Sequence, residues 1–135
     1  MKRMLDFFFA MHYVLYRYYR RKGFGEERAL NWTCSFQSCL SVLFMMGAIF
    51  LPCKLLNISI AFGKPLGIIY LCVFWAVEYF LFYRNGAYID VFLEYDRLRN
   101  TPAMKKKCRY AKVFNVCVIV FGLTCLYIAD YINHH

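Results

Sequence analysis

Long stretches without charged residues dominate the pattern of hydrophobic and polar positions along the chain. Cys34 to Leu51 and Val113 to Ala129 contain no charge, and each approaches the ~20 residues that a helix needs to cross the apolar core of a bilayer. Leu66 to Tyr83 is as long and is interrupted only by Glu78. We therefore predict an all-α membrane protein with three transmembrane spans, at 34–52, 65–83 and 113–131.

The N-terminal segment, residues 1–32, has a different pattern. Leu5 to Tyr19 is apolar but contains Asp6, His12 and Arg17, and it owes its apolarity to Phe and Tyr, which favour the headgroup region of a membrane. Basic residues follow directly. We predict an amphipathic helix that lies in the plane of the interface. A fourth span is the alternative.

The segment between the second and third spans, residues 86–112, is predicted to be a helical hairpin outside the bilayer. Its first half, 87–99, has an amphipathic helical pattern. Asn100-Thr101-Pro102 is typical of a helix end followed by a new N-cap, and the new helix is expected to run on into the third span. This segment either only connects two spans or docks a partner through the acidic residues Asp90, Glu94 and Asp96.

Charge orients the predicted spans. Of the 17 Lys and Arg residues, all except Lys54 and Lys64 precede the first span or lie between the second and third. With three spans these two basic groups share a side, which the positive-inside rule assigns to the cytoplasm, with the C-terminus outside the inner membrane. A net charge of +9 is then explained by topology and anionic lipid, so we do not expect nucleic-acid binding.

Composition and motifs exclude several other classes of protein. Hydrophobic residues make up 61% of the chain and charged residues 19%, too apolar for a short soluble domain. The seven cysteines form no CxxC pair and only three histidines are present, so we expect neither a metal site nor another cofactor. The chain has no nucleophile elbow and no phosphate-binding glycine loop, and we predict that it is not an enzyme.

Glu78 is the only Asp, Glu, Lys or Arg within the apolar stretches 34–51, 66–83 and 113–129. It lies roughly 9 Å inside the cytoplasmic end of its span by helical rise. A carboxylate there is costly unless it is paired, protonated or hydrated. Candidate partners are Asn115, Gln37, Ser38 and Arg84. Glu78 either fixes helix packing, recognises a partner helix or belongs to a proton path, and the absence of a second relay group argues against the last.

Small residues recur on one face of two spans. In lipid such stripes allow helices to approach closely. They either pack the first and third spans together or are offered to another protein. The stripe of the third span is Ala111, Asn115, Val118, Gly122, Cys125 and Ala129, and that of the first is Cys34, Ser38, Ser41 and Ala48.

The order of segments carries one resemblance. A span that ends in aromatic residues (FLFYRNGAYIDVFLEYDRL) is followed by a Lys-rich stretch and a final apolar span. This order, over about Leu66 to Ile132, resembles small bacterial inner-membrane proteins, some of which are immunity proteins encoded beside secreted antibacterial toxins. The resemblance implies that the chain neutralises a membrane-inserting toxin.

The lack of catalytic groups independently favours a protein that binds another membrane protein. Glu78, the two stripes and the acidic helix are the candidate surfaces for that partner. A pore-forming, holin-like homo-oligomer and an accessory subunit of a larger membrane complex are the alternatives.

Overall fold

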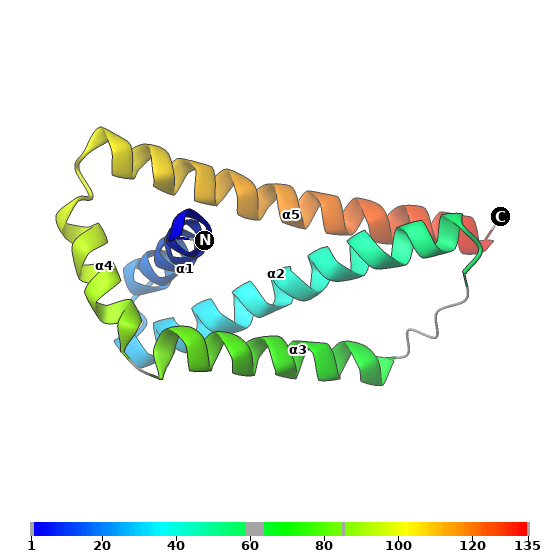
Figure 1. The fold of residues 1–135 in the computed structure, drawn as a ribbon, viewed down its shortest axis with the longest axis horizontal. Helices are drawn as coiled ribbons and strands as arrows, with labels where there is room; N and C mark the ends of the chain where they lie inside the picture. Colours follow the sequence, from blue (N-terminus) through cyan, green and yellow to red (C-terminus); the bar gives the residue numbers. More distant parts are fainter. Residues whose placement is uncertain (1, 59–63, 85, 135) are drawn as a thin grey trace.

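The computed structural model describes residues 2–58, 64–84 and 86–134, and within these ranges it contains helices and no strand. Figure 1 shows their arrangement. The elements are α1 (Lys2–Arg21), α2 (Glu26–Leu55), α3 (Lys64–Glu78), the π-helical segment η1 (Tyr79–Tyr83), α4 (Ala87–Arg97) and α5 (Pro102–His134). The prediction of an all-helical chain is therefore confirmed.

Two helices of the described chain, α2 and α5, are each long and apolar enough to cross a membrane. A third span is counted if α3 and η1 are taken together with α4, from which they are bent by 69°. The two or three candidate spans agree with the sequence prediction at this level. α2 begins eight residues before the predicted span at Cys34 and runs past Pro52 to Leu55.

α2 and α5 lie side by side and converge toward the C-terminal end of α5 (Figure 1). The small-residue stripe of α5 forms this contact, since all six of its residues are buried. A Cβ atom on Gly122 would lie only 2.3 Å from Cγ of Leu43 on α2. A Cβ atom on Gly47 of α2 would lie 3.2 Å from atoms of both Phe121 and Cys125 on α5. Part of the α5 stripe therefore packs against α2 within the chain. The stripe predicted on the first span does not take part throughout, because Cys34 and Ser38 contact Glu78 of α3 and Ala48 is exposed.

α1 occupies the opening between α2 and α5 at the end where these helices diverge, and α4 lies across the same end (Figure 1). Four consecutive residues of α1, Ala10 to Tyr13, are buried, so its middle is enclosed on every side. Residues from α4 and α5, among them Phe92, Tyr95 and Met104, complete this core. The Phe and Tyr side chains of α1 find aromatic partners within the chain.

The segment predicted as 1–32 is divided in the structure. α1 ends at Arg21, Gly23 takes a positive φ of 87°, and α2 begins at Glu26. The boundary before α5 follows the sequence prediction, because the backbone N–H of Met104 donates to Oγ1 of Thr101 at 3.3 Å. From Pro102 the helix continues unbroken for 33 residues, so the prediction that one helix runs on into the third apolar stretch is confirmed.

Candidate functional site

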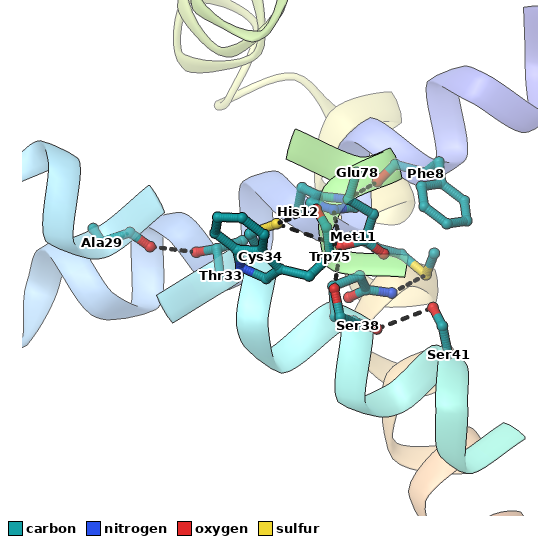
Figure 2. A network of polar contacts seen from close by, with 11 residues as sticks. Phe8, Met11, His12, Ala29, Thr33, Cys34, Ser38, Ser41, Trp75 and Glu78 are labelled. Carbon is teal, nitrogen blue, oxygen red and sulfur yellow. Dashed lines mark hydrogen bonds and ion pairs between the residues drawn. The ribbon is translucent and has the colours of Figure 1, made fainter. Parts of the chain in front are cut away.

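A cluster of buried polar side chains lies where α1, α2 and α3 meet (Figure 2). Glu78 is the last residue of α3, His12 lies in the middle of α1, and Cys34 and Ser38 are one turn apart on α2. None of the four residues is more than 3% exposed. Segments separated by dozens of residues therefore bring an acid, an imidazole, a thiol and a hydroxyl to one place inside the helical bundle.

One carboxylate oxygen of Glu78 is the centre of the cluster. Ser38 Oγ donates a hydrogen bond to Oε2 at 3.0 Å, and Cys34 Sγ donates a weaker one at 3.7 Å. His12 Nε2 lies 3.6 Å from the same oxygen, within ion-pair range but beyond a direct hydrogen bond. The other oxygen, Oε1, has no hydrogen-bond partner among the described residues.

The geometry fixes the tautomer of His12. Its Nδ1 lies 2.9 Å from the backbone oxygen of Phe8, which can only accept, so Nδ1 carries a hydrogen. A neutral ring then presents the lone pair of Nε2 toward Glu78, and a carboxylate there would be repelled. One further proton, on Nε2 or on the carboxyl group, makes the contact favourable.

The π-helical segment η1 follows Glu78 directly. Its backbone closes i→i+5 hydrogen bonds, such as Arg84 N to Tyr79 O at 3.0 Å. This wider turn allows Phe82 and Tyr83 to face the same side as Glu78. Phe82 is buried and stacks on Phe8 with ring centroids 5.8 Å apart. η1 thereby holds Glu78 against α1 through aromatic contacts on either side of His12.

Several buried polar atoms around the cluster keep unused hydrogen-bonding capacity. Among the described residues, Gln37 Oε1, Tyr83 Oη and Asn115 Oδ1 have no partner, as is also the case for His12 Nε2 and Glu78 Oε1. Gln37 makes only a weak contact, from Nε2 to the sulfur of Met11 at 3.9 Å. Native proteins rarely leave so many buried polar atoms unpaired.

The order of groups does not match that of a hydrolytic triad. In a triad the histidine lies between the nucleophile and the acid, whereas here Glu78 lies between Ser38 and His12. Within the described ranges, no group of three or more His, Cys, Asp or Glu side chains could hold a metal ion. The arrangement joins three helices through buried polar contacts.

The sequence analysis identified Glu78 and one of its partners, Ser38, but missed His12. Gln37 and Asn115 are buried without a contact to Glu78 among the described residues, and Arg84 lies over the ring of Phe80 instead. Glu78 therefore has a titratable neighbour, His12, that comes from outside the predicted spans. The missed signal was a histidine within the aromatic stretch of α1, where an interfacial helix would place it near water.

The remaining candidate residues are divided between packing and surface. Gly122 and Asn115 belong to the α2–α5 contact, and Ser41 donates to the backbone oxygen of Gln37 at 3.0 Å. Asp90 and Glu94 are exposed on α4.

Asp96 is separate from the other two acidic residues of α4. It accepts a hydrogen bond from Tyr13 at 2.5 Å and lies 3.8 Å from Arg17. The predicted acidic cluster is therefore two exposed carboxylates and one that ties α4 to α1.

A second polar network joins α1 to α4 and α5. Asp6 accepts a hydrogen bond from Tyr95 and pairs with Lys107, whose Nζ lies 2.5 Å from Oδ2. Burial raises the pKa of Asp6, but the hydrogen bonds from Lys107 and Tyr95 outweigh it and the pKa falls below 3.8. Burial, together with the hydrogen bond to Asp96, raises the pKa of Tyr13 to about 12. These contacts tie α1 to α4 and α5.

Comparison of the chain with protein-family models, curated proteins and solved structures finds no match.

Proposed function

We propose that this chain is an integral membrane protein that acts by binding another membrane protein through its transmembrane helices. Only 28% of the most apolar part of α2, and the same share of α5, is buried inside the chain. Most of the apolar surface of both helices is thus free to contact lipid or a partner helix. The internal pairing of Glu78 and the use of the α5 stripe within the chain leave the partner surface elsewhere on the bundle.

A groove between α2 and α3 carries the proposal. It has a volume of about 230 Å³ and is lined by Ser35, Cys39, Leu71, Cys72 and Trp75. Three of these side chains are small, and Cys39 and Cys72 are exposed. In lipid, where apolar surface alone does not drive association, small residues favour helix pairing because they allow two backbones to approach closely. The groove has this composition and opens outward.

The face of α3 beside the groove is also suited to a partner helix. Its large apolar residues are exposed over most of the helix, and they include Ile68, Ile69, Val73 and Val77. By the contacts described, α3 packs against α2 and η1. A helix seated in the groove would therefore also cover part of α3.

The distribution of basic residues supports an orientation for this protein. The basic end of α1, α4 and the Lys-rich start of α5 lie at the same end of the bundle (Figure 1). This arrangement favours a cytoplasmic N-terminus and an external C-terminus in a bacterial inner membrane, by the positive-inside rule. In its most specific form, the partner is a membrane-inserting antibacterial toxin that the chain holds inactive, as the resemblance to immunity proteins implies.

The test is to purify the full chain from its native membrane in mild detergent and to identify co-purifying proteins by mass spectrometry. Cys72→Trp fills the groove, and Cys117→Trp makes the same change at an exposed position of α5 outside it. We expect one stoichiometric partner with the wild-type chain and with Cys117→Trp, and its loss with Cys72→Trp.

Other outcomes contradict parts of the proposal. A partner retained by both variants would show that the groove between α2 and α3 is not the binding site. A homo-oligomer without any other protein would favour the pore-forming alternative. A partner that belongs to a transporter or enzyme would favour the accessory-subunit alternative over the toxin.

A further inference from the structure

A basic cavity lies between α1 and the first turns of α5. Its volume is about 590 Å³, within the range of pockets that hold small molecules. Half of its twelve lining residues are Lys or Arg, and none is acidic. The cavity does not include the residues of the Glu78 cluster, and nothing in the partner-binding proposal depends on it.

Matched spacing on the two helices builds the cavity. α1 contributes positions 14, 17, 18 and 21, flanked by Tyr13 and Leu15, and α5 contributes 105, 108, 109 and 112. Both sets follow the i, i+3, i+4, i+7 pattern that places residues on one face of a helix. α1 and α5 are in contact, and these two faces line the same cavity. The clustering of positive charge therefore follows from the register of the two helices.

The positive charge in the cavity has little internal compensation. Arg17 lies 3.8 Å from Asp96. Among the residues that the structure describes, the other five basic side chains form no ion pair with an acidic side chain. Cations held together without counter-charges repel one another, and a bound anion relieves this repulsion through charge-assisted hydrogen bonds. The chemistry of the lining thus favours a phosphate group.

The position of the cavity favours a lipid over a soluble anion. Lys112, at one edge of the cavity, directly precedes the charge-free stretch 113–129 of α5. Val14, Leu15 and Cys108 add apolar surface beside the basic groups. A ligand that fits this lining has an anionic head and an apolar tail.

We propose that the cavity between α1 and α5 binds an anionic phospholipid. Its phosphate lies among the Lys and Arg side chains, and its acyl chains follow the apolar surface of α5 toward the bilayer. Basic pockets beside transmembrane helices on the cytoplasmic side are known to take such headgroups. The bound lipid fastens α1 to α5 at the end where the bundle is widest.

Native mass spectrometry of the full chain in detergent tests this proposal. The protein is offered equal amounts of phosphatidylglycerol and phosphatidylcholine with identical acyl chains. We expect phosphatidylglycerol to be retained preferentially. Replacing one phosphate-binding cation should weaken its binding by roughly tenfold, because a charge-assisted hydrogen bond contributes at least that factor. The variants Lys105→Gln and Arg109→Gln are both expected to show this loss.

Lys106→Gln is the matched control. It removes the same charge from the neighbouring position, but Lys106 lies over the ring of Tyr110 and does not line the cavity. A micelle of non-ionic detergent, which is the kind used in this experiment, has no anionic surface, so this variant should retain the lipid as well as the wild-type chain does. Equal losses in Lys105→Gln and Lys106→Gln would overturn the proposal in favour of unspecific attraction.

Inorganic phosphate distinguishes the two sources of the anion. Inorganic phosphate, added at the same concentration as the lipid, should leave phosphatidylglycerol bound. Displacement of the lipid by inorganic phosphate would assign the cavity to a soluble anion and overturn the proposal. Circular dichroism of each variant establishes that the helices are intact.

Discussion

Removal of the Glu78 side chain tests whether the buried pair stabilises the bundle. Glu78→Ala leaves a cavity among residues that are nearly fully enclosed, and it deprives Ser38 Oγ of its acceptor. Large-to-small changes at buried positions cost about 2–5 kcal/mol. A lost hydrogen bond between membrane helices costs only about 0.6 kcal/mol on average. We therefore expect a loss of about 3 kcal/mol, or roughly a hundredfold in the folding equilibrium.

Glu78→Gln separates the loss of volume from the loss of a hydrogen bond. The amide fills the same space, but the group that replaces Oε2 can serve either Ser38 or the lone pair of His12, not both. One contact is lost, and we expect a cost of about 1 kcal/mol. Glu94→Ala removes an exposed carboxylate from α4 and should change stability by less than about 0.5 kcal/mol.

Equilibrium unfolding in mixed micelles with increasing SDS measures these differences. The fluorescence of Trp75 reports on the site, because its backbone oxygen accepts the contact from Cys34. A Glu78→Ala protein as stable as Glu94→Ala would refute the reasoning. Equal destabilisation by Glu78→Ala and Glu78→Gln would show that the loss of the polar contacts to Ser38 and His12, and not the lost volume, sets the cost in stability.

Two further predictions concern helix packing and pH. Gly122→Ala should destabilise the α2–α5 contact by about 1–3 kcal/mol, because the side chain of Leu43 on α2 must move. Gly67→Ala is the control: its new methyl group would meet nothing within 4 Å, so it should be neutral or slightly stabilising in the same unfolding assay. Stability should also fall at both extremes of a pH series. The lowered pKa of Asp6 stabilises the fold above pH 3.8, and this contribution is lost as the pH falls through the lower folded value. The raised pKa of Tyr13 stabilises the fold below pH 10, and this contribution is lost as the pH rises to about 12. An Asp6→Asn protein with an unchanged acid limb would contradict the first of these pH effects.

Local patterns predicted the parts of the fold that depend on local physics. The charge-free stretches of α2 and α5, and the cap at Thr101, follow from burial in lipid and from backbone hydrogen bonding within one turn. The position of α1 does not. The four adjacent buried residues Ala10 to Tyr13 point to all sides of the helix, so the sequence pattern does not indicate one face of α1 as the surface that contacts the other helices. His12 and Glu78 meet only because α4 and α5 enclose α1, and this depends on contacts between distant segments.

The basic cavity lies between these two cases. Each of its helical faces can be recognised in the sequence by spacing, but the Lys and Arg residues of α1 and α5 were interpreted only as signals of orientation and of general attraction to anionic lipid. Their meeting across a shared cavity depends on the packing of α1. The same charges thus serve topology and, in our proposal, recognition of a lipid.

The pairing of Asp6 with Lys107 has a consequence for the order of events during synthesis. These residues are 101 positions apart, and a ribosome adds ~5–20 residues each second. α1 therefore waits for roughly 5–20 s before its partner on α5 exists. During that time its aromatic surface is available to lipid, chaperones or proteases. The contact that fixes α1 forms only when α5 has been synthesised and is in place. An unfinished chain therefore exposes the aromatic surface of α1, which distinguishes it from the completed protein.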